Sequence, residues 1–335
     1  MIPQGPALPF LAARDHSAET RARLDVLTAE LASGRTSDLG RAVSSDFSRV
    51  SQIAHHLRTH DARNAALSGA ATWLQTAQAS LDKVQAANDA LASLIPASMS
   101  PAGLANIGTL AAIGRGAVAD IGSALNASLA GRPIFANGDP GVGRPLDVDL
   151  LLAETAALAA AAPDLPSMLQ AFDDYFSPAP STGIEAAVIG PFRAEPMAIA
   201  LGDGAALGVP VSLADPGIRD ALKQAALVAG LDRTGFAIGG ADRSRLAVEL
   251  PVRNATAADG VTRIRGRLGG VEERVARIAS QLGEDRVRME GQQAEAIASD
   301  PFETASRLQG EMTRLETIFA VTARRARLRL TDFIR

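Results

Sequence analysis

The side chains best suited to metal chemistry in this sequence are His56 and His60, spaced four residues apart in a stretch expected to be helical. This spacing places two imidazoles on one helix face, as zinc sites can require. No glutamate lies between the two histidines and no third ligand is evident, so we expect a solvated helix face and no metal. Because the chain contains no cysteine, disulfides, thiolate-bound zinc and thiol catalysis are also excluded.

Two other patterns imitate catalytic or cofactor-binding sites. The glycine-rich string at 138–144 is similar in outline to a phosphate-binding loop, but it lacks the Gly-Lys-Ser/Thr ending, and we expect a linker turn. The adjacent carboxylates Asp173-Asp174 and Glu272-Glu273 would point to different faces of a helix, so neither pair forms an acid–base couple. We therefore predict no catalytic residue, no cofactor and no enzymatic activity.

A cluster of arginines is the third candidate, as a contact to nucleic acid; it comprises Arg324, Arg325, Arg327 and Arg329. The cluster falls in the last turns of an expected helix, where cations complement the helix dipole, and no aromatic residues alternate with it. The chain has a net charge of −4 and 4% aromatic residues, which favours neither attraction to nucleic acid nor base stacking. We expect these arginines to pair between subunits and no nucleic acid to bind.

The length of 335 residues allows about two domains, and the 47% of hydrophobic residues can supply a core. The most apolar stretch, 150–162, is shorter than the roughly 18 residues that a membrane span needs. Three prolines precede residue 10 and the first charge is Arg14, which does not fit a secretory signal. We expect no membrane insertion, and either a cytosolic location or export by a route that uses no cleaved signal peptide.

Helices with heptad spacing must position any functional surface. Within 44–94, Leu67, Leu74 and Leu81 recur every seven residues, after an apparent phase shift that follows Leu57. Farther along the chain, steps of three and four residues define a second stripe and a third: Ile264, Leu268, Val271, Val275, Ile278 and Leu282, then Leu308, Met312, Leu315 and Phe319. Such narrow stripes are buried only against another helix.

The start of the last helix is marked by capping residues. Asp300 is the expected N-cap, Pro301 the first helical residue, and Glu303 the partner that closes a capping box.

The middle of the chain shows shorter periods and more glycine and proline. Helices are predicted at about 104–129, 147–162 and 216–230, the last capped by Asp215. Strands are predicted at 134–135, 197–201, 209–213, 236–238 and 246–252, with a hairpin turn at 202–204. The middle therefore indicates an α+β domain between two heptad-bearing segments.

The economical fold is mainly α: an elongated, coiled-coil-like antiparallel helical rod, formed by the N- and C-terminal segments, with an inserted α+β outer domain. The expected parts are an assembly segment at 1–43, rod halves at 44–130 and 256–299, the outer domain at 131–255, and an assembly helix at 300–335. The rod seam comprises Leu67, Leu74, Leu81 and the stripe from Ile264 to Leu282.

Several strings resemble the flagellin superfamily, and within it the flagellar hook–filament junction proteins (hook-associated protein 3). Leu24, Leu27 and Leu31 precede a Ser33-Gly34-Arg35 turn, which is similar to the N-terminal string of that family. Asn126 followed by 131–136 is similar to the segment that leaves the rod, and 300–330 looks like the junction protein's last helix. The arginine-rich last helix departs from the glutamine-rich helix usual in flagellins, which favours the junction protein. The resemblance covers roughly 20–135 and 260–335.

The resemblance implies a structural protein of the bacterial flagellum that is exported unfolded through the flagellar type III pathway. It implies a homo-oligomer in a ring or helical layer, located outside the cell, whose partners are a hook-side junction protein, flagellin and an export chaperone. The implied assembly residues are Leu24, Leu27, Leu31, Leu308, Met312, Leu315, Phe319, Arg324 and Arg325, which would lack partners until other subunits supply them. The alternatives are flagellin itself and, in a different class, a cytoplasmic coiled-coil adaptor.

Overall fold

The computed structural model describes residues 8–38, 40, 47–98, 107–136, 144–177, 183–184, 197–202, 205–209 and 211–333. Within these ranges the chain is mainly helical, with eight helices and two small two-stranded antiparallel sheets. The expected fold class, mainly α with short strands, is confirmed at this level. None of the described helices is both long enough and apolar enough to cross a membrane.

The chain divides into two compact units, which we describe separately. Unit 1 comprises 1–60 and 282–335, and unit 2 comprises 61–281. The two divisions fall inside the long helices α3 (Ser48–Ser98) and α9 (Gly240–Ala296). Of the boundaries expected from the sequence, 255/256 lies within α9, whereas 299/300 lies in the short interval between α9 and α10 (Pro301–Phe333).

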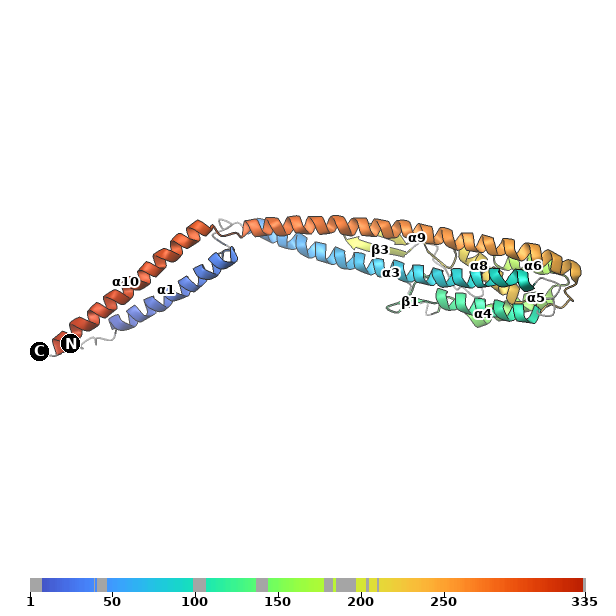
Figure 1. Ribbon diagram of the computed structural model, residues 1–335, viewed down its shortest axis with the longest axis horizontal. Helices are drawn as coiled ribbons and strands as arrows, with labels where there is room; N and C mark the ends of the chain where they lie inside the picture. The colour runs from blue at the N-terminus through green and yellow to red at the C-terminus, as the bar shows by residue number, and fades with distance from the viewer. Residues whose placement is uncertain are drawn as a thin grey trace. The chain divides into compact units, whose positions relative to one another are not determined.

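In unit 2, α3 and α9 lie side by side and antiparallel (Figure 1). The Gln78 amide donates to the carbonyl oxygen of Arg265 at 3.2 Å, and the Asn254 amide donates to the carbonyl oxygen of Asn88 at 3.2 Å. Arg265 also forms an ion pair with Asp82 at 2.6 Å. Residues later in α3 therefore pair with residues earlier in α9, so the two helices run antiparallel, as the two heptad stripes predict.

The expected seam residues differ in their burial. Those with at most 8% exposure are Leu67, Leu74, Leu81, Ile264, Leu268 and Val275 in unit 2, and Leu282 in unit 1. Val271 and Ile278 are half-buried. The expected phase shift after Leu57 is wrong, because one seven-residue spacing runs unbroken through the buried residues Ile53, His60, Leu67, Leu74, Leu81, Asn88 and Ile95. His60 hid this continuity because it is polar and lies between Leu57 and Leu67.

The shorter helices of unit 2 gather beside the α3/α9 pair, near the start of α9 (Figure 1). They are α4 (Ile107–Leu125), α5 (Val148–Ala161), α6 (Leu165–Tyr175) and α8 (Pro216–Ala229). Asp147 accepts hydrogen bonds from the amides of Asp149 and Leu150, so the predicted start of α5 is confirmed. Helix α8 ends before Gly230 as expected. Asp215 makes no side-chain cap there, and its carboxylate instead pairs with Arg267 and accepts from the Ser212 amide.

Close backbone contacts set how α8 packs. A Cβ atom on Gly260 of α9 would lie 2.5 Å from Gly217 Cα, and a Cβ atom on Gly114 of α4 would lie 2.4 Å from the Ala229 nitrogen. No side chain larger than hydrogen fits at either crossing without a shift of backbone. Ion pairs add to these contacts: Asp173 of α6 accepts from Arg253 of α9 at 2.8 and 2.9 Å and from Lys223 of α8 at 3.1 Å.

Several predicted strands are wrong. The stretch 246–252 belongs to α9, because Leu246 and Leu250 are buried one turn apart and continue the helical spacing. No strand forms at 236–238. Strand β2 is Arg132–Pro133, paired with β1 (Ser128–Leu129), so the predicted strand at 134–135 lies just after it. The predicted helix at 104–129 is shorter, since α4 ends at Leu125.

The predicted hairpin is confirmed, with a different second strand. Strand β3 (Met197–Gly202) pairs with β4 (Ala205–Val209), and Met197 lies opposite Val209. The pairs run from Gly202 with Ala205 to Met197 with Val209. The second strand is therefore 205–209 and not the predicted 209–213. Beyond it, the Leu213 amide donates to the carbonyl oxygen of Phe135 at 3.1 Å.

The glycine contact between α8 and α9 predicts that Gly260→Ala lowers the free energy of unfolding by about 2 kcal/mol, because the new methyl group must displace backbone. Gly266→Ala is the matched control in the same helix, since nothing lies within 4 Å of its Cβ position. It should raise stability by roughly 0.5–1 kcal/mol through helix propensity. Urea denaturation of both variants measures the difference, and equal effects would contradict the close contact.

Candidate assembly surface

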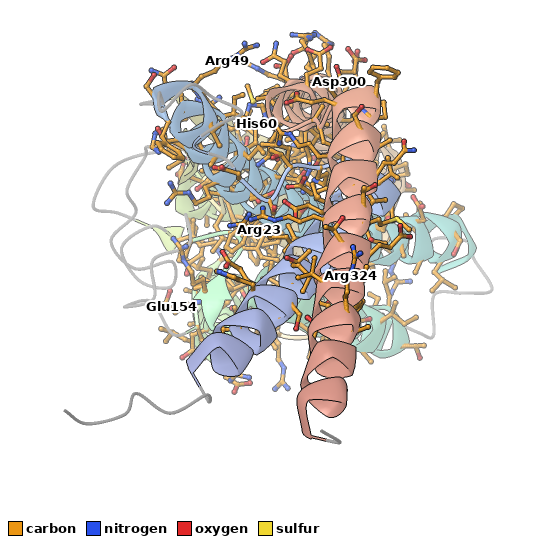
Figure 2. All side chains as sticks on the ribbon, turned by 90° about the vertical axis from the view of Figure 1, so that its left-hand side faces the viewer. Arg23, Arg49, His60, Glu154, Asp300 and Arg324 are labelled. Carbon is orange, nitrogen blue, oxygen red and sulfur yellow. The ribbon has the colours of Figure 1, made fainter. Side chains whose placement is uncertain are left out.

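Unit 1 is built around an antiparallel pair of helices, α1 (Leu8–Ser33) and α10. Arg23 of α1 lies 3.6 Å from the carboxylate of Glu311, and the Arg21 guanidinium lies over the Phe319 ring at 5.4 Å from its centroid. Figure 2 shows Arg23 at this pair and Arg324 farther along α10 from Asp300. The two segments expected to lack partners within one chain therefore contact each other.

At one end of this pair, backbone hydrogen bonds join the segment 33–38, which follows α1, to the segment 297–300, which precedes α10. We call these two segments together the clasp. Gly34 has φ +68° and ends α1, and its amide donates to the Glu30 carbonyl oxygen at 2.8 Å. The Thr36 amide donates to the Ile297 carbonyl oxygen at 2.9 Å, and the Ser299 amide donates to the Gly34 carbonyl oxygen at 3.0 Å. The segment that holds the predicted Ser-Gly-Arg turn is thus also hydrogen-bonded to the connection between α9 and α10.

Glu30 holds the clasp from inside. Its side chain is 7% exposed, and one carboxylate oxygen accepts from the Ser37 amide at 2.6 Å and from the Ser37 hydroxyl. These hydrogen bonds, the hydroxyl first, lower the pKa of Glu30 below its ordinary value against the opposing effect of burial. The carboxylate is therefore ionised in the folded clasp.

The start of α10 is built as the sequence predicts. The Asp300 carboxylate accepts from the amides of Phe302 at 2.8 Å and Glu303 at 3.2 Å, so Asp300 is the N-cap. The side chain of Glu303 forms an ion pair with Arg307, four residues along the same helix.

The α1/α10 pair buries polar rather than apolar side chains. Among its described side chains, 15–33 and 301–324, those below 9% exposure are Thr20, Glu30 and Thr304, and no apolar residue is among them. The predicted assembly residues Leu24, Leu27, Leu308 and Leu315 are half-buried. Leu31 is 39%, Met312 51% and Phe319 46% exposed, and Arg324 is exposed. The side chain of Arg325 lies outside the described residues.

Exposed apolar side chains are concentrated in unit 1. Of the twelve large exposed apolar residues in the described chain, eight belong to unit 1, the smaller unit. Three on α1 and α10 fall outside the heptad stripes and were missed from the sequence: Val26, Phe302 and Val321. The sequence could have indicated these residues, because each is apolar at a helix position outside the stripe, where a solvent-facing polar residue is expected. These three side chains add to the exposed apolar residues that α1 and α10 carry among their described side chains.

A groove of about 750 Å³ runs between α1 and α10. Its apolar lining includes Ala22, Val26 and Leu27, and its charged lining consists of Glu19, Glu30, Asp38 and Glu311 with Arg23 and Arg307. Four carboxylates and two guanidinium groups give the groove a net charge of −2. One carboxylate oxygen of Glu311 is buried without a hydrogen-bond partner among the described residues.

The histidines do not form a metal site in the part of the chain that the structure describes. His56 is exposed, but His60 is 8% exposed, so the expected solvated face is wrong for His60. It occupies a position in the buried seven-residue spacing of α3. No group of three or more potential ligands is found among the described residues.

The Glu30 contacts predict an acid-sensitive clasp. Because the folded pKa is lowered, the stabilisation is present above the ordinary value of about 4.3 and is lost as pH falls through the folded pKa. Glu30→Gln should remove this pH dependence and, by weakening charge-assisted hydrogen bonds worth about 1 kcal/mol, speed amide exchange at Thr36 and Ser299 roughly fivefold at neutral pH. Glu19→Gln, on the exposed face of α1, is the control and should change neither. Unchanged exchange in Glu30→Gln would contradict this role.

Comparison with known proteins gives no family for this chain. No family model matches its sequence, and no curated protein matches it significantly.

Proposed function

We propose that this chain is a structural subunit of the bacterial flagellum, an adaptor at the hook–filament junction that is exported by the flagellar type III pathway. The observation that carries the proposal is the α1/α10 pair, whose described side chains bury no apolar residue while six large apolar side chains stay exposed. These six are Val26, Leu31, Phe302, Met312, Phe319 and Val321. A surface of this kind is completed by neighbouring subunits.

The free energy available on assembly is substantial. Burying the remaining exposed half of a large apolar side chain contributes about 1 kcal/mol, so six such residues contribute on the order of 5 kcal/mol for each subunit. Side-chain ordering opposes part of this gain. A regular layer of copies would bury the same surfaces in every subunit, which suits a ring or helical layer.

Two further observations favour an exported structural protein. Two of the strings that resemble the junction proteins fall on the α1/α10 pair. The first ends with the turn after Leu31 at the end of α1, and the second is the helix that begins at Pro301. A chain without cysteine forms no disulfide that would oppose unfolding before export. In this proposal, the region 131–255 faces outward, and the partners are a hook-side junction protein, flagellin and an export chaperone.

Limited proteolysis of the purified chain distinguishes this proposal from a coiled-coil adaptor. Because the described side chains of α1 and α10 include no buried apolar residue, trypsin should cut unit 1, at arginines such as Arg21 and Arg314, at least tenfold faster than unit 2, at Arg253 and Arg265. Mass spectrometry of timed samples identifies the cuts. An adaptor that is complete as a monomer or dimer would protect both units equally.

Immunogold electron microscopy of sheared hook–filament particles tests the location. Antibody against 131–255 should label one band where hook meets filament. Label along the whole filament would instead identify the chain as flagellin, and label on no flagellar part would overturn the flagellar proposal.

Matched variants connect that location to the apolar surface. The double variant Met312→Ser/Phe319→Ser should be exported but should lose the band, because it removes two exposed side chains of the α1/α10 pair. The control Val248→Ser/Val252→Ser removes two valines of unit 2 that are 68% and 62% exposed, and it should keep the band. Equal labelling of the two variants at the junction would show that the exposed apolar side chains of α1 and α10 are not needed for assembly.

A further inference from the structure

We propose that Asn88, Gln224 and Asn254 form a buried site that binds water molecules in the core of unit 2, where the bound water links α3, α8 and α9. All three residues belong to unit 2, so the inference does not depend on the function proposed from the α1/α10 pair. The ligand is identified by the polar atoms that these side chains leave without partners.

Two hydrogen bonds bring the three side chains to the same part of α9. The Asn254 amide donates to the carbonyl oxygen of Asn88 at 3.2 Å, and the Gln224 amide donates to the carbonyl oxygen of Leu250 at 3.1 Å. Leu250 precedes Asn254 by about one helical turn, so α3 and α8 each contact the same turn of α9 through an amide.

The site is closed to solvent. Asn88 is 0% exposed, Gln224 1% and Asn254 4%. Each of them is flanked on its own helix, three and four residues away, by apolar side chains with 0% exposure: Val84 and Leu91, Ala221 and Val228, and Leu250 and Ala257. The three polar side chains therefore lie in an apolar core.

Four polar atoms of the site have no hydrogen-bond partner among the described residues. They are Nδ2 and Oδ1 of Asn88, Oδ1 of Asn254 and Oε1 of Gln224. Leaving so many buried polar atoms unsatisfied would cost a large part of the free energy of unfolding of a domain. Proteins satisfy such groups with ordered water, which forms roughly two to four hydrogen bonds for each molecule.

The donors and acceptors of the site match about two water molecules. The Nδ2 atom of Asn88 carries a pair of N–H donors, and the amide oxygens of all three side chains remain as acceptors. Each water accepts one N–H group, and the O–H groups of the waters reach the amide oxygens and join the waters to each other. The three side chains are uncharged, so a neutral ligand avoids the cost of burying an ion.

Magnetic relaxation dispersion of oxygen-17 in water counts the long-lived internal waters of the full-length chain. The triple variant Asn88→Leu/Gln224→Met/Asn254→Leu replaces the site with apolar side chains of similar volume, and it should lose the contribution of about two waters. Asn64→Leu, at an exposed asparagine of the same helix α3, is the control and should keep that contribution. Circular dichroism checks that each variant is folded.

A second measurement needs no substitution. In the wild-type chain, the side-chain amide of Asn88 should give a nuclear Overhauser cross-peak to water with the sign of a long-lived bound molecule, because its N–H groups donate to water within the core.

Urea denaturation gives a further signature of a shared site. Asn254→Leu alone leaves the polar groups of Asn88 and Gln224 buried with fewer partners, so the ratio of folded to unfolded chain should fall at least tenfold. The triple variant should return to the wild-type ratio or exceed it, because no polar group of the site remains to be satisfied.

Three results would overturn the inference. They are equal dispersion in the wild-type chain and the triple variant, an Asn88 amide without a cross-peak to bound water, and a triple variant that is less stable than Asn254→Leu. Direct pairing of the three side chains would give the second of these results, and independent sites would give the third.

Discussion

Unit 2 depends on the antiparallel contact between α3 and α9, since this contact fixes which residues of the two long helices face each other. Gln78 with Arg265 and Asn88 with Asn254 set the register, and the apolar seam fills the space between them. Helix α8 can then approach α9 closely at Gly260 and α4 at Gly114. A shift of one residue between α3 and α9 would misplace every one of these contacts.

Unit 1 follows the opposite physical rule. Its α1/α10 pair is held by an N-cap, surface ion pairs and the backbone hydrogen bonds of the clasp, and each of these contributes little in water. The described side chains of α1 and α10 bury Thr20, Glu30 and Thr304, whereas α3 and α9 bury leucines. This contrast in what the two parts bury is the observation from which we propose a structural subunit and not a self-contained adaptor.

The strongest local signals in the sequence predicted the elements well. The helix starts at Asp147 and Asp300 and the glycine ends at Gly34 and Gly230 depend on neighbouring residues and are confirmed in α5, α10, α1 and α8. The predicted seam residues of α3 and α9 are buried, apart from the half-buried Val271 and Ile278, whereas the side-chain cap predicted at Asp215 is wrong. The errors have two causes. A polar residue at a buried position, His60, interrupted a pattern that is continuous in space. The apolar stretch 246–252 was read as a strand although Leu246 and Leu250 repeat with a helical period.

The candidate surface was predictable only in part. The stripe residues of α1 and α10 could be identified by spacing, but the groove, the buried Glu30 and the exposed Val26 and Phe302 depend on how two distant segments meet. The helix α6 was missed although Leu165, Met168, Leu169 and Phe172 repeat with helical spacing, because the segment is only eleven residues long and prolines at 163 and 178 flank it in the sequence.

The clasp also constrains the order of folding. Arg35 and Ala298 form its bridge although 263 residues separate them along the chain. Closing so long a loop in an unfolded chain costs about 5 kcal/mol in entropy, far more than a few hydrogen bonds return. Once α3 and α9 have paired, so that Asn64 and Ala279 line one groove, most of that entropy has already been lost. We therefore expect the clasp to form after α3 and α9 have paired, and α1 and α10 to become ordered together when it closes.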